Sequence, residues 1–131
     1  MVRRWIIMIV LIFILTAGCI FEFKYVNNSF NWFINSLETL QIQLTQTKDK
    51  IDTEENIKYA YKIDEEWHDK VQNLKCLIWH SGIKEIEIGL ARVAVYVKEN
   101  DYKEASAEIA ALIDYSAHYL DDFTISDENL L

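Results

Sequence analysis

The amino-acid sequence opens with an apolar segment that contains no charged residue from Trp5 to Phe21. As an α-helix, these roughly 17 residues rise about 25 Å, slightly less than the ~30 Å hydrocarbon core of a bilayer. Two arginines precede the segment and only Lys24 follows it closely, so the positive-inside rule places the N-terminus in the cytoplasm. The sequence therefore predicts a single-pass membrane anchor over residues 1–26 and an extracytoplasmic helical domain over residues 27–131.

Two other interpretations use the same residues. A cleaved secretory signal peptide also combines a positively charged start, an apolar core and small residues before the cleavage site. The run from Thr16 to Cys19 supplies small residues, and it also resembles a bacterial lipobox, in which the cysteine is lipidated. Cys19 is therefore a candidate lipid-attachment site, although a cysteine is also an ordinary small apolar residue of a membrane helix. In all three cases the domain that follows leaves the cytoplasm.

The charge of the chain excludes nucleic acid as a partner, and its cysteine content excludes an intrachain disulfide in the domain. The chain of 131 residues has a formal net charge of −8 at pH 7, and its two N-terminal arginines lie outside the extracytoplasmic part. Nucleic acid is excluded as a partner, because phosphate binding needs clustered lysine and arginine. Outside the anchor, Cys76 stands alone, so this domain has no intrachain disulfide. Its apolar neighbours predict a buried structural thiol for Cys76.

The absence of proline and the presence of only three glycines favour helices joined by short turns. Apolar residues recur at spacings of three and four after the anchor, which is typical of amphipathic helices. Four such stripes run from Phe30 to Leu44, from Ile57 to Ile78, from Ile83 to Val97, and from Tyr102 to Tyr119. Asp52, Ser81 and Asp101 precede the last three stripes and are predicted N-caps. The predicted fold is all-α, with an N-terminal transmembrane helix followed by an antiparallel up-and-down bundle of about four helices.

The order of these features resembles a known family. The anchor and a long helix are followed by Trp67, by the segment IKEIEIGL at residues 83–90, by Tyr96 and a polar turn, and by SDENLL at residues 126–131. This pattern resembles an uncharacterised bacterial family, domain of unknown function 4363, over nearly the full length. The resemblance implies a small, membrane-attached helical protein of Gram-positive type. It implies no activity and no catalytic residues.

One short motif suggests metal chemistry. Glu65 and His68 have the Glu-x-x-His spacing that places two ligands on one face of a helix in di-iron proteins. A complete site needs a second such motif and two further glutamates, and the sequence holds no second Glu-x-x-His. Asp114 and His118, one turn apart on another predicted helix, are the residues that could face the first motif. Because Glu65 and His68 lie off the apolar stripe, we expect them to face solvent. The sequence predicts no enzyme, with no catalytic, cofactor-binding or metal-binding residue.

Three tryptophans outside the anchor, Trp32, Trp67 and Trp79, are unusual in so small a domain. Packing in the core is one interpretation, and an aromatic partner-binding patch is the other. The function that we predict is a non-enzymatic, membrane-anchored interaction or accessory module that binds another protein of the cell envelope and needs no cofactor. The alternatives are a lipoprotein anchored at Cys19, or a ligand-sensing bundle that acts through a membrane partner.

Overall fold

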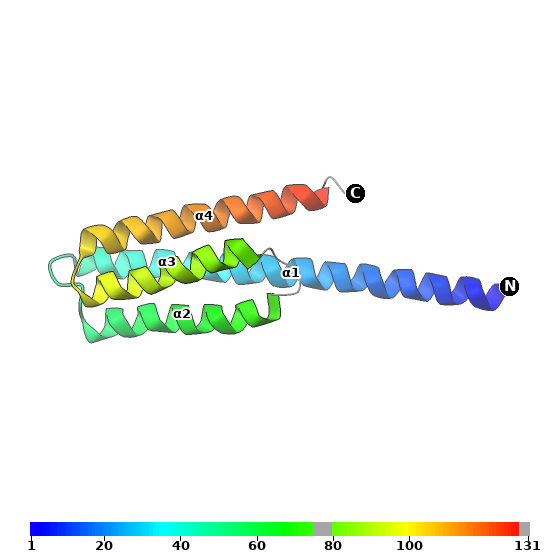
Figure 1. Ribbon diagram of the computed structural model, residues 1–131, viewed down its shortest axis with the longest axis horizontal. Helices are drawn as coiled ribbons and strands as arrows, with labels where there is room; N and C mark the ends of the chain where they lie inside the picture. The colour runs from blue at the N-terminus through cyan, green and yellow to red at the C-terminus, as the bar shows by residue number, and fades with distance from the viewer. Residues whose placement is uncertain (75–79, 129–131) are drawn as a thin grey trace.

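The computed structural model describes residues 1–74 and 80–128, which form four α-helices and contain no strand (Figure 1). The helices are α1 (Val2–Gln46), α2 (Glu54–Leu74), α3 (His80–Lys98) and α4 (Tyr102–Glu128). Successive helices run in opposite directions, and α4 returns alongside α1 toward the N-terminal end. The all-α, up-and-down prediction is confirmed. The predicted buried thiol, Cys76, lies outside the described residues.

The bundle is a closed ring of four helices. Helix α1 packs against α2 and α4, and α3 packs against the same two helices. Within the described ranges, α2 and α4 make no direct packing contact, nor do α1 and α3, so each of these pairs lies diagonally across the bundle. Short connections between antiparallel neighbours produce this arrangement. A side chain on the outer face of α2 therefore has α1 and α3 as its neighbouring helices.

Helix α1 is uninterrupted over 45 residues, and its two halves lie in different environments. Its side chains are exposed from Val2 through Glu22, and the first fully buried one is Val26. From Val26 onward, one stripe of α1 lies in the core. Its residues are Val26, Phe30, Phe33, Leu37, Leu40 and Leu44. Figure 1 shows the N-terminal half of α1 extending beyond the other three helices. The change from apolar exposed surface to bundle core occurs inside one continuous helix.

Aromatic rings fill the centre of the bundle. Trp67 of α2 is completely buried and packs edge-on against Phe30, with ring centroids 5.3 Å apart, and against Phe33 at 4.4 Å. On its other side, Phe30 stacks on Tyr119 of α4 at 5.2 Å. The indole N–H of Trp67 is buried without a hydrogen-bond partner in the described part of the chain. The stripes predicted for α2, α3 and α4 supply the rest of the core, including Ile63, Val71, Ile86, Leu90, Val97, Ile109 and Leu112.

Two of the three predicted N-caps are wrong. Helix α2 begins at Glu54, so the cap is Thr53, whose hydroxyl accepts a hydrogen bond from the Asn56 N–H at 3.2 Å. Asp52 lies one residue too early to reach these N–H groups, which is why it does not cap α2. Helix α3 begins at His80, which places Ser81 inside the helix. The third prediction is confirmed, because Asp101 Oδ1 accepts a hydrogen bond from the Glu104 N–H at 3.1 Å.

Side-chain amides close the end of the bundle that lies away from the N-terminus. Asn100 ends α3 in the left-handed conformation, with φ of 58°, and its Oδ1 accepts a hydrogen bond from the Ile51 N–H at 2.8 Å. The buried Asn56 donates through Nδ2 to the Ile51 carbonyl oxygen at 3.0 Å and to Thr47 Oγ1 at 2.8 Å. The bond to Asn100 joins the loop after α1 to the turn between α3 and α4, and the two bonds from Asn56 join the same loop to α2.

Candidate functional site

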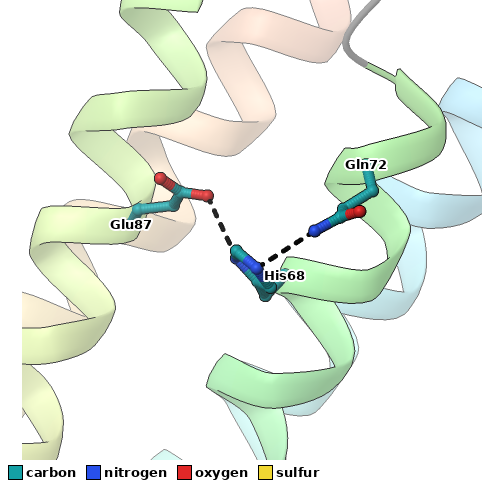
Figure 2. Close-up of polar contacts among 3 residues, drawn as sticks. All are labelled: His68, Gln72 and Glu87. Carbon is teal, nitrogen blue, oxygen red and sulfur yellow. Dashed lines mark hydrogen bonds and ion pairs between the residues drawn. The ribbon is translucent and has the colours of Figure 1, made fainter.

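A polar cluster on the bundle surface lies between α2 and α3. His68 of α2 faces Glu87 of α3, with 3.6 Å between Nδ1 and Oε1. On its other side, His68 Nε2 lies 3.3 Å from Nε2 of Gln72, one turn further along α2. Figure 2 shows His68 between these two partners. Because α2 and α3 are adjacent in the ring, this contact links two helices across the bundle surface.

Asp64 lies one turn before His68 and belongs to the same cluster. Partial burial raises the pKa of the Asp64 carboxyl above its ordinary value of 3.8. The negative charge of Glu87 raises this pKa further, whereas the charge of His68 lowers it. The cluster therefore holds two acids and one histidine, and the charges of Glu87 and His68 act on the protonation of Asp64. Among the described residues, no group of three or more His, Cys, Asp or Glu side chains is arranged to hold a metal ion.

The two pairs that the sequence suggested as metal ligands lie apart. Glu65 and His68 are both exposed on α2, as expected from their position off the apolar stripe. Asp114 and His118 are exposed on α4, which lies diagonally across the ring from α2. His118 Nδ1 instead contacts its own helix, at 2.8 Å from the Asp114 carbonyl oxygen and 3.4 Å from Asp114 Oδ1. These contacts raise the pKa of His118 above 6.5, the backbone carbonyl being the larger cause.

The tryptophans occupy different environments. Trp67 is a core residue and presents no surface to a partner. Trp32 is half-buried, and Lys70 Nζ lies 5.0 Å from the centroid of its ring. Trp32 also borders a small hollow of about 70 Å³ between α1 and α2, which is lined as well by Ser36, Tyr59, Lys62, Ile63 and Glu66. Trp79 lies outside the described residues. Trp32 is thus the candidate aromatic that the structure places at the surface.

Cys19 lies within the exposed apolar half of α1, and its thiol is free. The helix continues without a break on both sides of it. The candidate role of Cys19 in lipid attachment remains a prediction, because lipidation depends on processing of the preceding residues.

Sequence reasoning missed an apolar groove on the outer face of α3. It has a volume of about 330 Å³ and is lined by Ile88, Ala91, Arg92, Val95 and Tyr96. The signal was present in the sequence, because Ile88, Ala91 and Val95 repeat at helical spacing. This second stripe lies opposite the core stripe of the same helix.

The fold and its surfaces define the protein as a four-helix bundle with a long apolar extension of its first helix. In the described part of the chain, α1 is the one helix long and apolar enough to cross a membrane, a property that signal sequences share. The chain belongs to the family described as domain of unknown function 4363, whose profile matches residues 20–130. No curated protein and no solved structure matches the chain.

Proposed function

We propose that this protein is a non-enzymatic, single-pass membrane protein whose bundle binds another protein of the cell envelope. In this proposal the N-terminus lies in the cytoplasm and the bundle on the outer side. The observation that carries it is the continuity of α1, which is apolar and exposed in its first half and part of the bundle core in its second half. The bundle is therefore joined to the anchor by one of its own core helices, with no flexible linker between them.

The exposed surface of α1 supports the membrane anchor. Large apolar side chains from Val2 to Phe21 are at least half exposed all around this part of the helix. Each such side chain gains roughly 1.5–3 kcal/mol when it leaves water for an apolar environment. A helix that is apolar on every side needs to be covered on every side, and the described helices α2 and α4 pack only against its second half.

The surface of the bundle supports a protein partner. Its acidic side chains are spread over the outer faces of the helices, which disfavours nucleic acid and anionic lipid headgroups. Trp32 offers a half-exposed aromatic ring beside a lysine, and such rings are enriched at the centres of protein interfaces.

The anchor is tested on the full chain in its native membrane. We expect the protein to resist extraction by alkaline carbonate, to have the mass of a chain that starts at Met1, and to lose its bundle to protease added from outside. A chain that begins at a diacylated Cys19 would replace the transmembrane anchor with a lipid anchor. A chain released by carbonate would refute membrane attachment altogether.

The partner is tested by photo-crosslinking in intact cells. A photoreactive amino acid at Trp32 is expected to form an adduct with one particular envelope protein. The matched control carries the same amino acid at Tyr61, which is an exposed aromatic position on α2. Adducts that are equally abundant from both positions, or absent from both, would contradict a partner-binding role of Trp32.

A further inference from the structure

The groove on α3 has the geometry of a helix-packing site. Four of its lining residues, Ile88, Ala91, Arg92 and Val95, occupy positions i, i+3, i+4 and i+7. This set of four is the hole that accepts one side chain of a neighbouring helix in knobs-into-holes packing. Ile88 and Val95 are 39% and 50% exposed, so the hole is open on the outside of the bundle.

We propose that α3 of a second copy of this chain occupies the groove, in a parallel symmetric dimer. This inference rests on the membrane anchor of the proposed function. Two copies whose α1 helices enter one bilayer from the same side hold their α3 helices in the same direction. Ile88 and Val95, one heptad apart, then meet their own counterparts. We call this line of contact between the two α3 helices, formed by Ile88, Ala91 and Val95, the seam. Isoleucine and valine at the a positions of a heptad are typical of two-stranded parallel coiled coils, and the small Ala91 occupies the d position between them.

Charged residues on the two sides of the seam complement one another in this arrangement. Glu87 flanks the seam on the side of α2, where it faces His68, and Arg92 flanks it on the side of α4, where it lies near Glu108. The two residues are five positions apart, which is the spacing of the interhelical g-to-e pair in a parallel dimer. A two-fold axis along the seam therefore brings Glu87 of each copy to Arg92 of the other.

Glu87 and Arg92 can both leave their contacts within the bundle to form this pair between two copies. The Glu87 side chain is 38% exposed and that of Arg92 is 59% exposed. Their contacts within the bundle, at 3.6 Å to His68 and 3.9 Å to Glu108, are long for charge-assisted hydrogen bonds. Contacts of this kind contribute little in water, so their loss does not oppose association.

The area of the seam indicates where association occurs. Three apolar residues over two turns of helix cover far less than the roughly 800 Å² that each partner contributes to a stable interface. Contact through α3 alone therefore does not hold two copies together in dilute solution. Anchoring in one bilayer aligns the copies and raises their effective concentration. The dimer is thus a property of the membrane-bound chain.

The experiment is cysteine crosslinking of the full chain in native membranes. All variants carry Cys76→Ala and retain Cys19, the Cys76→Ala chain alone gives the dimer yield due to Cys19, and each further variant adds one of Ile88→Cys, Val95→Cys, Ile42→Cys or Tyr61→Cys. The last two are controls, because Ile42 on α1 and Tyr61 on α2 are exposed apolar positions on other faces. Disulfide formation needs Cα atoms within about 7 Å, so only a seam residue is expected to give a reducible dimer upon mild oxidation.

The charge pair is tested in the Ile88→Cys background. We expect Glu87→Arg to lower the yield of dimer at least about fivefold, because the symmetric dimer then has two repulsive pairs. Adding Arg92→Glu is expected to restore the yield. A variant that merely fails to fold is recognised by loss of helical circular dichroism, and the restoring substitution separates charge complementarity from a structural effect.

Each outcome decides the proposal. Dimers that are specific to Ile88→Cys and Val95→Cys, with rescue by charge exchange, support it. Equal yields from the two control positions overturn it, and so does an adduct with a different protein without dimer. If the chain sits in the membrane but these cysteines do not crosslink, the self-association is refuted while the anchor stands. Release of the chain by carbonate refutes both.

Discussion

Asn100 stabilises the end of α3 in two ways, through its left-handed backbone and through a side-chain hydrogen bond. Its backbone is left-handed, with φ of 58°, and its side chain accepts a hydrogen bond from the Ile51 N–H at 2.8 Å. Backbone bonds from Asn100 to Val97 and from Asp101 to Tyr96 complete the end of α3 as a Schellman motif. Three substitutions separate these contributions: Asn100→Gly, Asn100→Ala and Asn100→Asp.

The expected losses follow from what each side chain retains. Glycine adopts the left-handed conformation without strain but cannot accept the hydrogen bond, which leaves a partly buried N–H of Ile51 unpaired and costs about 1–2 kcal/mol. Alanine loses the same bond and adds about 1 kcal/mol for its Cβ in the left-handed region. Aspartate keeps both the acceptor and the tolerance for positive φ. We therefore expect Asn100→Ala to be the least stable, Asn100→Gly intermediate, and Asn100→Asp close to the native chain.

The assay is equilibrium unfolding of the full chain in detergent micelles, followed by helical circular dichroism against urea concentration. The midpoint is expected to fall in this order while the dependence on urea stays unchanged. Glu99→Ala serves as the control, because Glu99 is an exposed neighbour on the same turn. Equal stabilities of the glycine and alanine variants would refute the argument from φ, and a native-like glycine variant would refute the role of the hydrogen bond.

Three further predictions use the same assay. Trp67→Ala removes a completely buried side chain and is expected to cost about 3–5 kcal/mol, whereas Trp32→Ala, at a half-exposed position, is expected to cost less than about 1.5 kcal/mol; equal losses would contradict the placement of Trp67 in the core. Gly89→Ala places a Cβ 2.5 Å from Leu112 Cδ2, so overpacking costs about 1–3 kcal/mol, whereas the gain in helix propensity is about 1 kcal/mol. We therefore expect the variant to be less stable than the native chain, and a stabilised variant would argue against this clash. Asp64→Asn is expected to stabilise the chain at pH 7 by a few tenths of a kcal/mol, roughly, after solvent screening. Its raised pKa means that the folded state disfavours the ionised carboxylate, so the advantage should disappear as the pH falls below 3.8, where Asp64 is protonated in both states; an advantage that persists there would contradict the assigned cause.

The helices and their buried faces could be predicted from local pattern. The stripe from Phe30 to Leu44 is completely buried in the structure, and so is Trp67 on the predicted core face of α2. A stripe at helical spacing is a property of neighbouring residues, and it needs no knowledge of the rest of the chain. The same reasoning placed Glu65 and His68 on the outside.

The ends of the helices were harder to predict. Asp52 and Thr53 can both cap a helix, and the choice depends on which residue precedes the first turn. The boundary drawn at residue 26 marks where the apolar composition ends, but the helix continues through it because Val26, Phe30 and Phe33 are already packed in the bundle. Composition changes at that point without a change in backbone conformation.

The contacts of the candidate sites depended on the packing of distant segments. His68 and Glu87 meet because α2 and α3 are neighbours in the ring, and Asn100 reaches Ile51 because two connections lie at the same end of the bundle. The stripe of Ile88, Ala91 and Val95 is present in the sequence, but only the packing of the opposite face of α3 in the core leaves it as an exposed groove.

By itself, the sequence determined the all-α class, the apolar N-terminal segment and the faces that each helix buries. These properties arise from spacing along the chain and from transfer of apolar side chains out of water, both of which are local. Only the tertiary structure decided the ring order, the diagonal separation of α2 from α4, and the polar contacts between helices. Those features depend on which buried faces fit against one another, and side chains far apart in the sequence become neighbours only through that packing.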